Sequence, residues 1–216
     1  FAFTTTEGGA TLECSLDGAP FATCTSPITY TGLSIDEHVF TVRAAATDPQ
    51  PSVYVWHIVP APVPTTVTCG QVLNHSVQLL NSLSNCPAGG LYIGAANIAV
   101  DLNGQTVDGL NYSGTGQSSG LPAGITNIGF DNVLIYGGTV QEFGYGILLM
   151  TETTHNTIRN TTLLTNAIAG AMLADTSNSL VRDNNLGGNL EGVWLMNADN
   201  NVVLNNSLDD NIGVPI

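Results

Sequence analysis

The residues that could do acid–base chemistry are few in this chain. Its basic side chains are Arg43, Arg159 and Arg182, and lysine is absent. Removing a proton next to a sugar carboxylate, as a polysaccharide lyase does, requires such a base beside carboxylates that bind calcium. Arg159 and Arg182 instead recur at the same place in two similar segments. We predict that both stack on an outer surface, with Glu152 or Asp183 as partners, and that neither is a catalytic base.

The sequence also gives little support for glycoside hydrolysis by a pair of carboxylates. Asp209 and Asp210 form the one acidic pair of the C-terminal repeats, and they lie in a predicted turn, where a solvated role is expected. His75 and His155 have no partner residues nearby in the sequence, and no nucleophile elbow or phosphate-binding loop occurs. We predict no catalytic residue and no cofactor. Turns rich in Asp and Asn leave weak Ca²⁺ binding open, although EF-hand spacing is absent.

The four cysteines fall as two local pairs, Cys14 with Cys24 and Cys69 with Cys86. Each pair lies within one predicted domain, and the even count favours two disulfides. A zinc site is the alternative, but the two-residue Cys spacing and a nearby His pair are missing. Disulfides indicate an oxidising, extracytoplasmic location, and we expect an extracellular or cell-surface protein.

The charge balance limits the partners. The formal net charge is −14, so nucleic acids and anionic membranes should be repelled. Polyanionic sugars should be repelled as well unless divalent cations bridge them. No run of about 18 apolar residues occurs, so no membrane insertion is expected. The chain opens directly in a strand-like segment, from which we expect a processed or truncated N-terminus.

Four Asn-x-Ser/Thr sequons are candidate glycosylation sites. Because the chain is rich in Asn, Thr and Ser, such triplets also arise by chance, and both interpretations stay open. The candidate residues are Asn74, Asn111, Asn160 and Asn205.

Short alternating apolar runs separated by turn residues fill residues 1–59, which predicts a small β-sandwich. The segments Cys14-Ser-Leu-Asp-Gly18 and His38-Val-Phe-Thr-Val-Arg-Ala44 resemble the immunoglobulin-like repeats of bacterial surface proteins. In such proteins these modules are spacers or assembly units, and the resemblance implies the same role here. Residues 60–66 are rich in proline and predict an extended linker.

A repeat of 21 to 24 residues begins after the linker and runs through residues 67–216. Each copy has short β-branched runs and Asn or Gly turns, which predicts a stacked solenoid. A leucine-rich repeat has a similar period but needs a fixed leucine pattern, so we favour a parallel β-helix of about six coils. Side chains one repeat apart should stack, giving hydrogen-bonded columns. The predicted columns are Asn166, Asn189 and Asn211, and Asn160, Asp183 and Asn205.

The segment from Asn97 to Gly109, together with Gly90-Leu-Tyr-Ile-Gly-Ala95, resembles right-handed β-helix proteins of the pectin-lyase-like superfamily. The resemblance covers residues 67–216 and implies a capped first coil, which Cys69 and Cys86 would staple. That superfamily includes lyases, hydrolases, epimerases and non-catalytic surface proteins. The Gly-His-Gly and Arg-x-Lys signatures of a polygalacturonase-like hydrolase are missing. The expected fold is therefore all-β, with an N-terminal immunoglobulin-like β-sandwich and a right-handed parallel β-helix.

One strand of each repeat predicts an apolar stripe on the outer surface. Three adjacent positions of this strand form three columns when the repeats stack. Side chains alternate along a strand, so the first and third columns face inward and the middle column faces outward, together with the neighbouring Met150 and Met196. The middle column holds Leu148, Met172, Trp194 and Pro215. Either the N-terminal domain or a loop covers this stripe, or it is a subunit interface.

Two functions remain. The first is a non-catalytic extracellular structural protein that self-associates into a glycosylated filament, through strand edges and the apolar stripe. The alternative is a β-helix protein that binds or degrades a polysaccharide. The partners expected are other copies of the chain or glycans.

Overall fold

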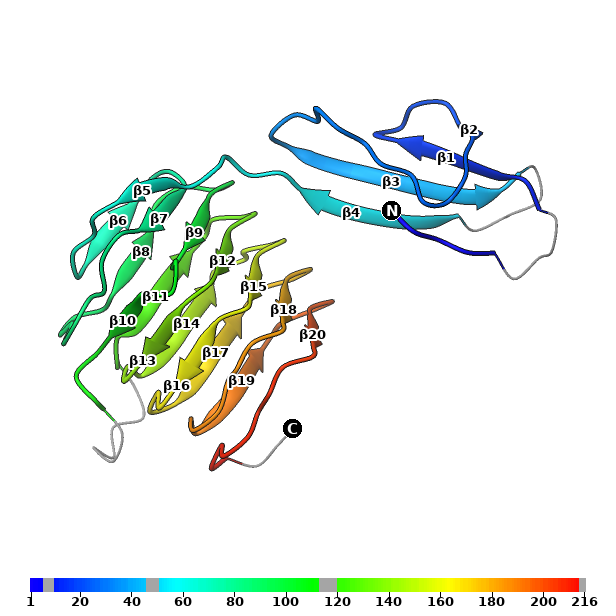
Figure 1. Ribbon diagram of the computed structural model, residues 1–216. Helices are drawn as coiled ribbons and strands as arrows, with labels where there is room; N and C mark the ends of the chain where they lie inside the picture. The colour runs from blue at the N-terminus through cyan, green and yellow to red at the C-terminus, as the bar shows by residue number, and fades with distance from the viewer. Residues whose placement is uncertain (6–9, 46–50, 113–119, 214–216) are drawn as a thin grey trace. The chain divides into compact units, whose positions relative to one another are not determined.

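The computed structural model describes residues 1–5, 10–45, 51–112 and 120–213 and divides the chain into two compact units (Figure 1). The N-terminal unit is Phe1–Ile58, and the second unit begins at Val59. All regular elements of the described residues are β-strands, so the all-β prediction is confirmed.

The N-terminal unit is a four-stranded antiparallel sheet in the order β2-β1-β3-β4. The Cys14–Cys24 disulfide ties β1 to the residue that follows β2. The strand bounds are Leu12–Leu16 for β1, Ala22–Thr23 for β2, Glu37–Ala44 for β3 and Ser52–His57 for β4.

The described strands of this unit form one sheet rather than the two of a sandwich, which differs from the predicted arrangement. An aromatic cluster covers one face of the sheet instead. The ring of Phe1 stacks on Phe40 of β3 with centroids 4.5 Å apart, and Trp56 of β4 lies 4.9 Å from Phe1. Aromatic side chains bury large areas, so a few of them can cover the apolar face of a small sheet.

A charged hydrogen-bond pair joins the first turn to β3. The Nδ1 atom of His38 lies 2.8 Å from a carboxylate oxygen of Asp17, and its Nε2 atom lies 2.9 Å from the Ser34 carbonyl oxygen. The Ser34 carbonyl, followed by the Asp17 carboxylate, raises the pKa of His38 above its ordinary value. The hydrogen bond from His38, followed by that from the Val39 N–H, lowers the pKa of Asp17.

This pair predicts a pH-dependent stability for the N-terminal unit. Because the pKa of His38 is raised on folding, its contribution is complete below about pH 6.5, the ordinary histidine pKa, and is lost as pH rises through the folded value. The contribution of Asp17, whose pKa is lowered, is lost only in stronger acid. We expect the thermal midpoint followed by Trp56 fluorescence in a Trp194→Phe background to fall between pH 6 and 9. His38→Gln should flatten this profile, whereas His75→Gln should leave it unchanged; an unaltered slope in His38→Gln would contradict the assignment.

The second unit is a parallel β-helix whose strands stack in three sheets, as Figure 1 shows. The three middle coils pass from sheet I to sheet II to sheet III, whereas the others have no regular strand in sheet II among the described residues; the chain then returns to sheet I one level further along. The seven strands of sheet I are β5 (Val63–Thr65), β7 (Val77–Leu79), β9 (Ala99–Asp101), β12 (Leu134–Tyr136), β15 (Thr157–Arg159), β18 (Leu180–Arg182) and β20 (Val202–Leu204). The three strands of sheet II are β10 (Thr106–Asp108), β13 (Thr139–Gln141) and β16 (Thr162–Leu164). The six strands of sheet III are β6 (Gln71–Leu73), β8 (Leu91–Ile93), β11 (Ala123–Ile128), β14 (Tyr145–Met150), β17 (Ala169–Ala174) and β19 (Glu191–Met196).

The segment predicted as the linker 60–66 is partly structured. Its residues Val63–Thr65 form β5, which pairs in parallel with β7 of sheet I. The β-helix therefore begins inside this proline-rich segment rather than at residue 67. The Cys69–Cys86 disulfide joins the first coil, before β6, to the second coil, after β7, with a Cα–Cα distance of 5.4 Å.

The core of the β-helix is a set of inward columns, one from each sheet. Along sheet I, Val100, Ile135, Ile158 and Val181 are paired in register and are at most 1% exposed. Such stacking of β-branched side chains explains the apolar runs of the repeat, because alternation along each strand sends every second side chain inward.

Buried asparagines hold the corner between sheets II and III, as predicted. The side-chain oxygen of Asn189 accepts a hydrogen bond of 2.8 Å from the backbone N–H of Asn166, and that of Asn211 accepts one of 2.9 Å from Asn189. The amide nitrogen of Asn189 also donates to the Leu163 and Leu186 carbonyls. These side chains therefore satisfy backbone groups that the turn would leave buried and unpaired.

The other predicted column, Asn160, Asp183 and Asn205, is not buried. These residues directly follow β15, β18 and β20 and have positive φ, a conformation that Asn and Asp tolerate well. The buried ladder of this corner lies one residue later, where Asn184 accepts from the Thr161 N–H and Asn206 accepts from the Asn184 N–H.

A third ladder closes the corner between sheets III and I. Asn156 accepts from the Val133 N–H at 2.9 Å, Ser179 from the Asn156 N–H at 3.1 Å, and Asn201 from the Ser179 N–H at 2.8 Å. Every corner of the coil is thus held by a buried polar column.

Removing one ladder side chain should destabilise the β-helix strongly. We expect Asn189→Leu to lower the free energy of unfolding by about 3 kcal/mol, because each buried polar group that loses its partner costs about 1–3 kcal/mol. Urea unfolding followed by far-UV circular dichroism measures the change. The control is Asn160→Gly, which removes an exposed side chain at φ 49° and should stay within about 0.5 kcal/mol. Equal losses in the two variants would refute the ladder's role.

Candidate functional site

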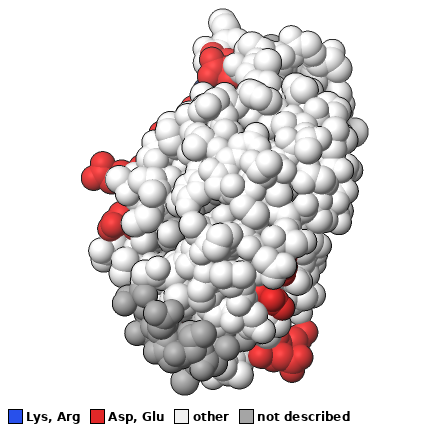
Figure 2. Space-filling view, turned by 90° about the vertical axis from the view of Figure 1, so that its left-hand side faces the viewer, with Lys and Arg blue, Asp and Glu red and all other residues white. Residues whose placement is uncertain are grey.

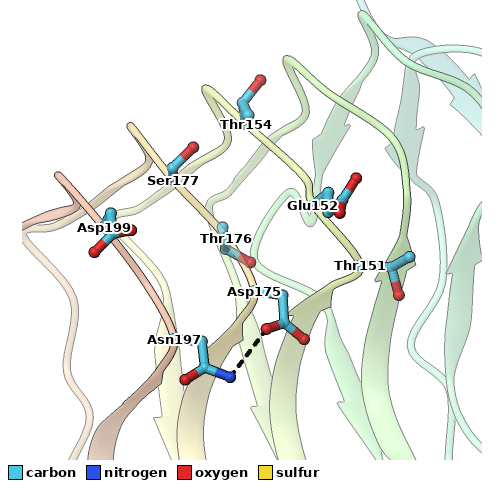
Figure 3. Close-up of a pocket in the computed structure, with 8 residues that line it drawn as sticks. All are labelled: Thr151, Glu152, Thr154, Asp175, Thr176, Ser177, Asn197 and Asp199. Atoms are coloured by element: carbon cyan, nitrogen blue, oxygen red, sulfur yellow. Dashed lines mark hydrogen bonds between the residues drawn. The ribbon is translucent and has the colours of Figure 1, made fainter.

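A polar groove follows the corner between sheets III and I over three successive coils (Figure 3). Its volume is about 660 Å³. The lining residues are Thr151, Glu152, Thr154, Asp175, Thr176, Ser177, Asn197 and Asp199. No basic residue is among them, so the groove is an acidic and hydroxyl-rich surface.

Equivalent residues directly after three strands build the edge of the groove. Thr151 follows β14, Asp175 follows β17 and Asn197 follows β19, and all three have positive φ. The chain turns outward at these positions, so the side chains project to solvent. The amide of Asn197 donates to the Asp175 carboxylate at 3.2 Å, which links neighbouring coils.

The carboxylates of the groove are spread along it. Glu152, Asp175 and Asp199 lie on successive coils, and Figure 3 shows them separated rather than converging. Within the described part of the β-helix, no three His, Cys, Asp or Glu side chains place their ligand atoms within 4.8 Å of one another. The groove can therefore accept hydrogen bonds from an extended ligand, but its carboxylates do not surround a single Ca²⁺ ion.

Sequence reasoning missed this groove. Its signal was available, because the residues after β14, β17 and β19 occupy the same register and are all polar. They were overlooked because the residue types differ from coil to coil, so no repeated motif marks them.

The predicted outer stripe is present on sheet III. Leu148, Met172 and Trp194 are paired in register on β14, β17 and β19, while their neighbours Leu149 and Leu173 point into the core. In the adjacent outward column, Met150, Ala174 and Met196 are paired in the same way. Pro215 lies outside the described residues.

The stripe is a packed cluster and not a scatter of apolar residues. Met172 faces outward yet is only 8% exposed, because Leu148 and Trp194 pack on either side of it. Met196 is 41% exposed and Leu148 and Trp194 are half-buried, so these residues present apolar area to solvent. Burial raises the pKa of Tyr145, which lies at the start of β14 in the same cluster.

The predicted chemical residues do not come together in one place. Arg159 and Arg182 lie side by side on the outer face of sheet I, as expected, and Arg182 pairs with Asp183 at 2.6 Å. His75 lies in the first coils and is exposed, whereas His155 precedes β15.

The four sequon asparagines are all exposed in the structure. Asn160 and Asn205 directly follow strands of sheet I, and Asn111 lies after β10. Their side chains are accessible among the described residues, and their modification stays a prediction.

The charge pattern of one face agrees with the composition. Figure 2 shows acidic side chains at the rim of this face, a wide uncharged area between them, and no Lys or Arg. No helix in the described residues is long and apolar enough to cross a membrane.

Fold and site together define a parallel β-helix protein with an acidic, hydroxyl-rich groove along one corner. Residues 64–216 match the family model described as "Periplasmic copper-binding protein (NosD)", and the chain belongs to this family. Searches of the curated proteins and of the solved structures gave no significant match. The family description and the two disulfides agree on an extracytoplasmic protein.

The described residues of the β-helix do not fit the copper site that the family description implies. Copper prefers thiolate, thioether and imidazole ligands. All four cysteines are in disulfides, and the two β-helix histidines, His75 and His155, lie on different coils. Met150 and Met172 pack in the apolar cluster on sheet III, and Met196 is separated from Met150 by the strand that carries Ala174. We therefore derive no chemistry through copper.

Proposed function

We propose that this protein is a non-catalytic structural component of the extracellular face of the cell, which self-associates through the stripe on sheet III. The observation that carries the proposal is the in-register column of Leu148, Met172 and Trp194 on an outer face. Exposed apolar clusters of this kind are typical of protein interfaces, where aromatic and methionine side chains are enriched.

A second copy is the occupant that best suits the stripe. A two-fold interface pairs the same patch on both subunits, and an uncharged patch can pair with itself without repulsion. The chain carries a net charge of −14 and the stripe column holds no charged side chain, so two copies repel each other less there than at an acidic surface.

A second contact would extend pairs into a filament. Strand β4 is an edge of the N-terminal sheet, and its Val53, Tyr54 and Val55 side chains are 58%, 57% and 42% exposed. An apolar edge strand offers unpaired backbone groups to another strand. One contact through the sheet III stripe and a second through the edge strand β4 would be enough to link copies of the chain into a polymer.

The non-catalytic part of the proposal rests on the site geometry. The carboxylates of the polar groove lie on separate coils, and Arg159 and Arg182 are on another face. The finer features belong to the same proposal: an immunoglobulin-like spacer at the N-terminus, a right-handed β-helix like those of the pectin-lyase-like superfamily, and glycans at the exposed sequons.

Polysaccharide binding in the polar groove is the second candidate function, favoured by the eight polar residues that line the groove.

Charge on the stripe should weaken self-association. We expect sedimentation velocity to show association of the oxidised full-length chain as concentration rises. Trp194→Glu should raise the dissociation constant at least about 30-fold, since losing a central aromatic anchor costs about 2 kcal/mol or more.

The matched control is Thr157→Glu, which adds the same charge to the outer face of sheet I. It should associate like the unmodified chain. A monomer at every concentration up to the millimolar range, or equal weakening by both variants, would overturn the proposal.

A further inference from the structure

Two of the three basic residues of the chain stand next to each other on sheet I. The outward column of this sheet runs through Asp101, Tyr136, Arg159 and Arg182, each paired in register with the next. Neighbouring strands are about 4.8 Å apart, so the arginine side chains leave the sheet as close parallel neighbours.

This pairing costs stability unless something offsets it. Like charges directly opposite each other on a sheet destabilise it. Arg182 has a partner, because its Nη1 atom lies 2.6 Å from the Asp183 carboxylate. Among the described residues, no carboxylate lies within 4.0 Å of the Arg159 guanidinium. Arg159, Arg182 and Asp183 together therefore carry one net positive charge, in a chain whose net charge is −14.

The guanidinium of Arg159 is held in place without being neutralised. It lies over the ring of Tyr136, 4.9 Å from the centroid, as a cation–π contact. Burial, and then the nearby Asp101 carboxylate, raises the pKa of Tyr136, so its hydroxyl stays protonated at neutral pH. Asp101 is in turn held by the Gln78 amide at 2.9 Å and by the Asn103 N–H at 2.8 Å.

We propose that Arg159 and Arg182 bind the carboxylate of a single acidic sugar residue in an otherwise neutral glycan. One carboxylate balances the one net positive charge and can bridge the two guanidinium groups. Arginine is suited to this task, because its planar fork matches a carboxylate with two parallel hydrogen bonds.

The surroundings select against a polyanion. Asp101 lies two strands from Arg159 in the same column, and Asp183 lies beside Arg182. Both would repel a second negative charge but would accept hydrogen bonds from neutral sugar hydroxyls.

A sugar suits the site better than a peptide. Strands β15 and β18 are each paired on both sides, so their backbone groups are not free for an added strand. A peptide would therefore lose the main-chain hydrogen bonds on which strand addition depends. Gln78, Asp101 and Thr157 offer side-chain hydrogen-bonding groups of the kind that sugar hydroxyls use.

The test is calorimetric titration of the full-length chain at low salt with cellobiouronic acid, a disaccharide of glucuronic acid and glucose. We expect it to bind at least about tenfold more tightly than neutral cellobiose, because charge-assisted hydrogen bonds are roughly twice as strong as neutral ones. Arg159→Gln should abolish this preference and Arg159→Lys should restore part of it. The control Arg43→Gln alters an arginine already paired with Glu13 at 2.9 Å and should leave binding unchanged.

Acetate and a Gly-Asp-Gly peptide separate the sources of the carboxylate. Both should bind at least about tenfold more weakly than the acidic disaccharide. Equal binding of either one, equal binding of cellobiose, or unchanged binding by Arg159→Gln would overturn the proposal. The result is independent of self-association, because the sheet I column and the sheet III stripe share no residue.

Discussion

The β-helix depends on how its corners satisfy backbone hydrogen bonds. Three sheets meet at sharp turns, and each turn buries N–H and carbonyl groups that strand pairing does not reach. A column of Asn, Ser or Thr side chains at every corner supplies the partners, as with Asn166, Asn189 and Asn211. Because each side chain serves the neighbouring coil, the corners lock the register of all three sheets.

The same constraint shapes the surface. With inward positions filled by aliphatic columns and corners filled by amides, what distinguishes one face from another is the outward column alone. The outward column of sheet III holds Leu148, Met172 and Trp194, and that of sheet I holds Tyr136, Arg159 and Arg182. The outward column is therefore apolar on sheet III and mixed aromatic and charged on sheet I.

The repeat made the core predictable, because Asn189 and Leu173 follow from periodicity. It did not separate a buried asparagine from an exposed one. Asn205 and Asn206 are adjacent, and only the backbone conformation decides that the first turns outward with positive φ while the second, half-buried, joins the ladder. The polar groove was missed for a related reason, since Thr151, Asp175 and Asn197 share a position but not a residue type. The single N-terminal sheet was unexpected because Phe1, far from Phe40 in sequence, covers its face.

Glycine explains why this architecture changes by whole coils. A Cβ atom on Gly170 would lie 2.8 Å from the Gly192 carbonyl oxygen and 3.0 Å from the Asn189 amide, and Gly146 and Gly192 face the same crowding. Insertion of one residue would move a side chain into that space and shift every ladder beyond it. Loss or gain of a full repeat preserves all of these contacts. Lengthening by duplication is therefore the route of variation that the fold tolerates best, and the reach of the molecule can change while its corners stay the same.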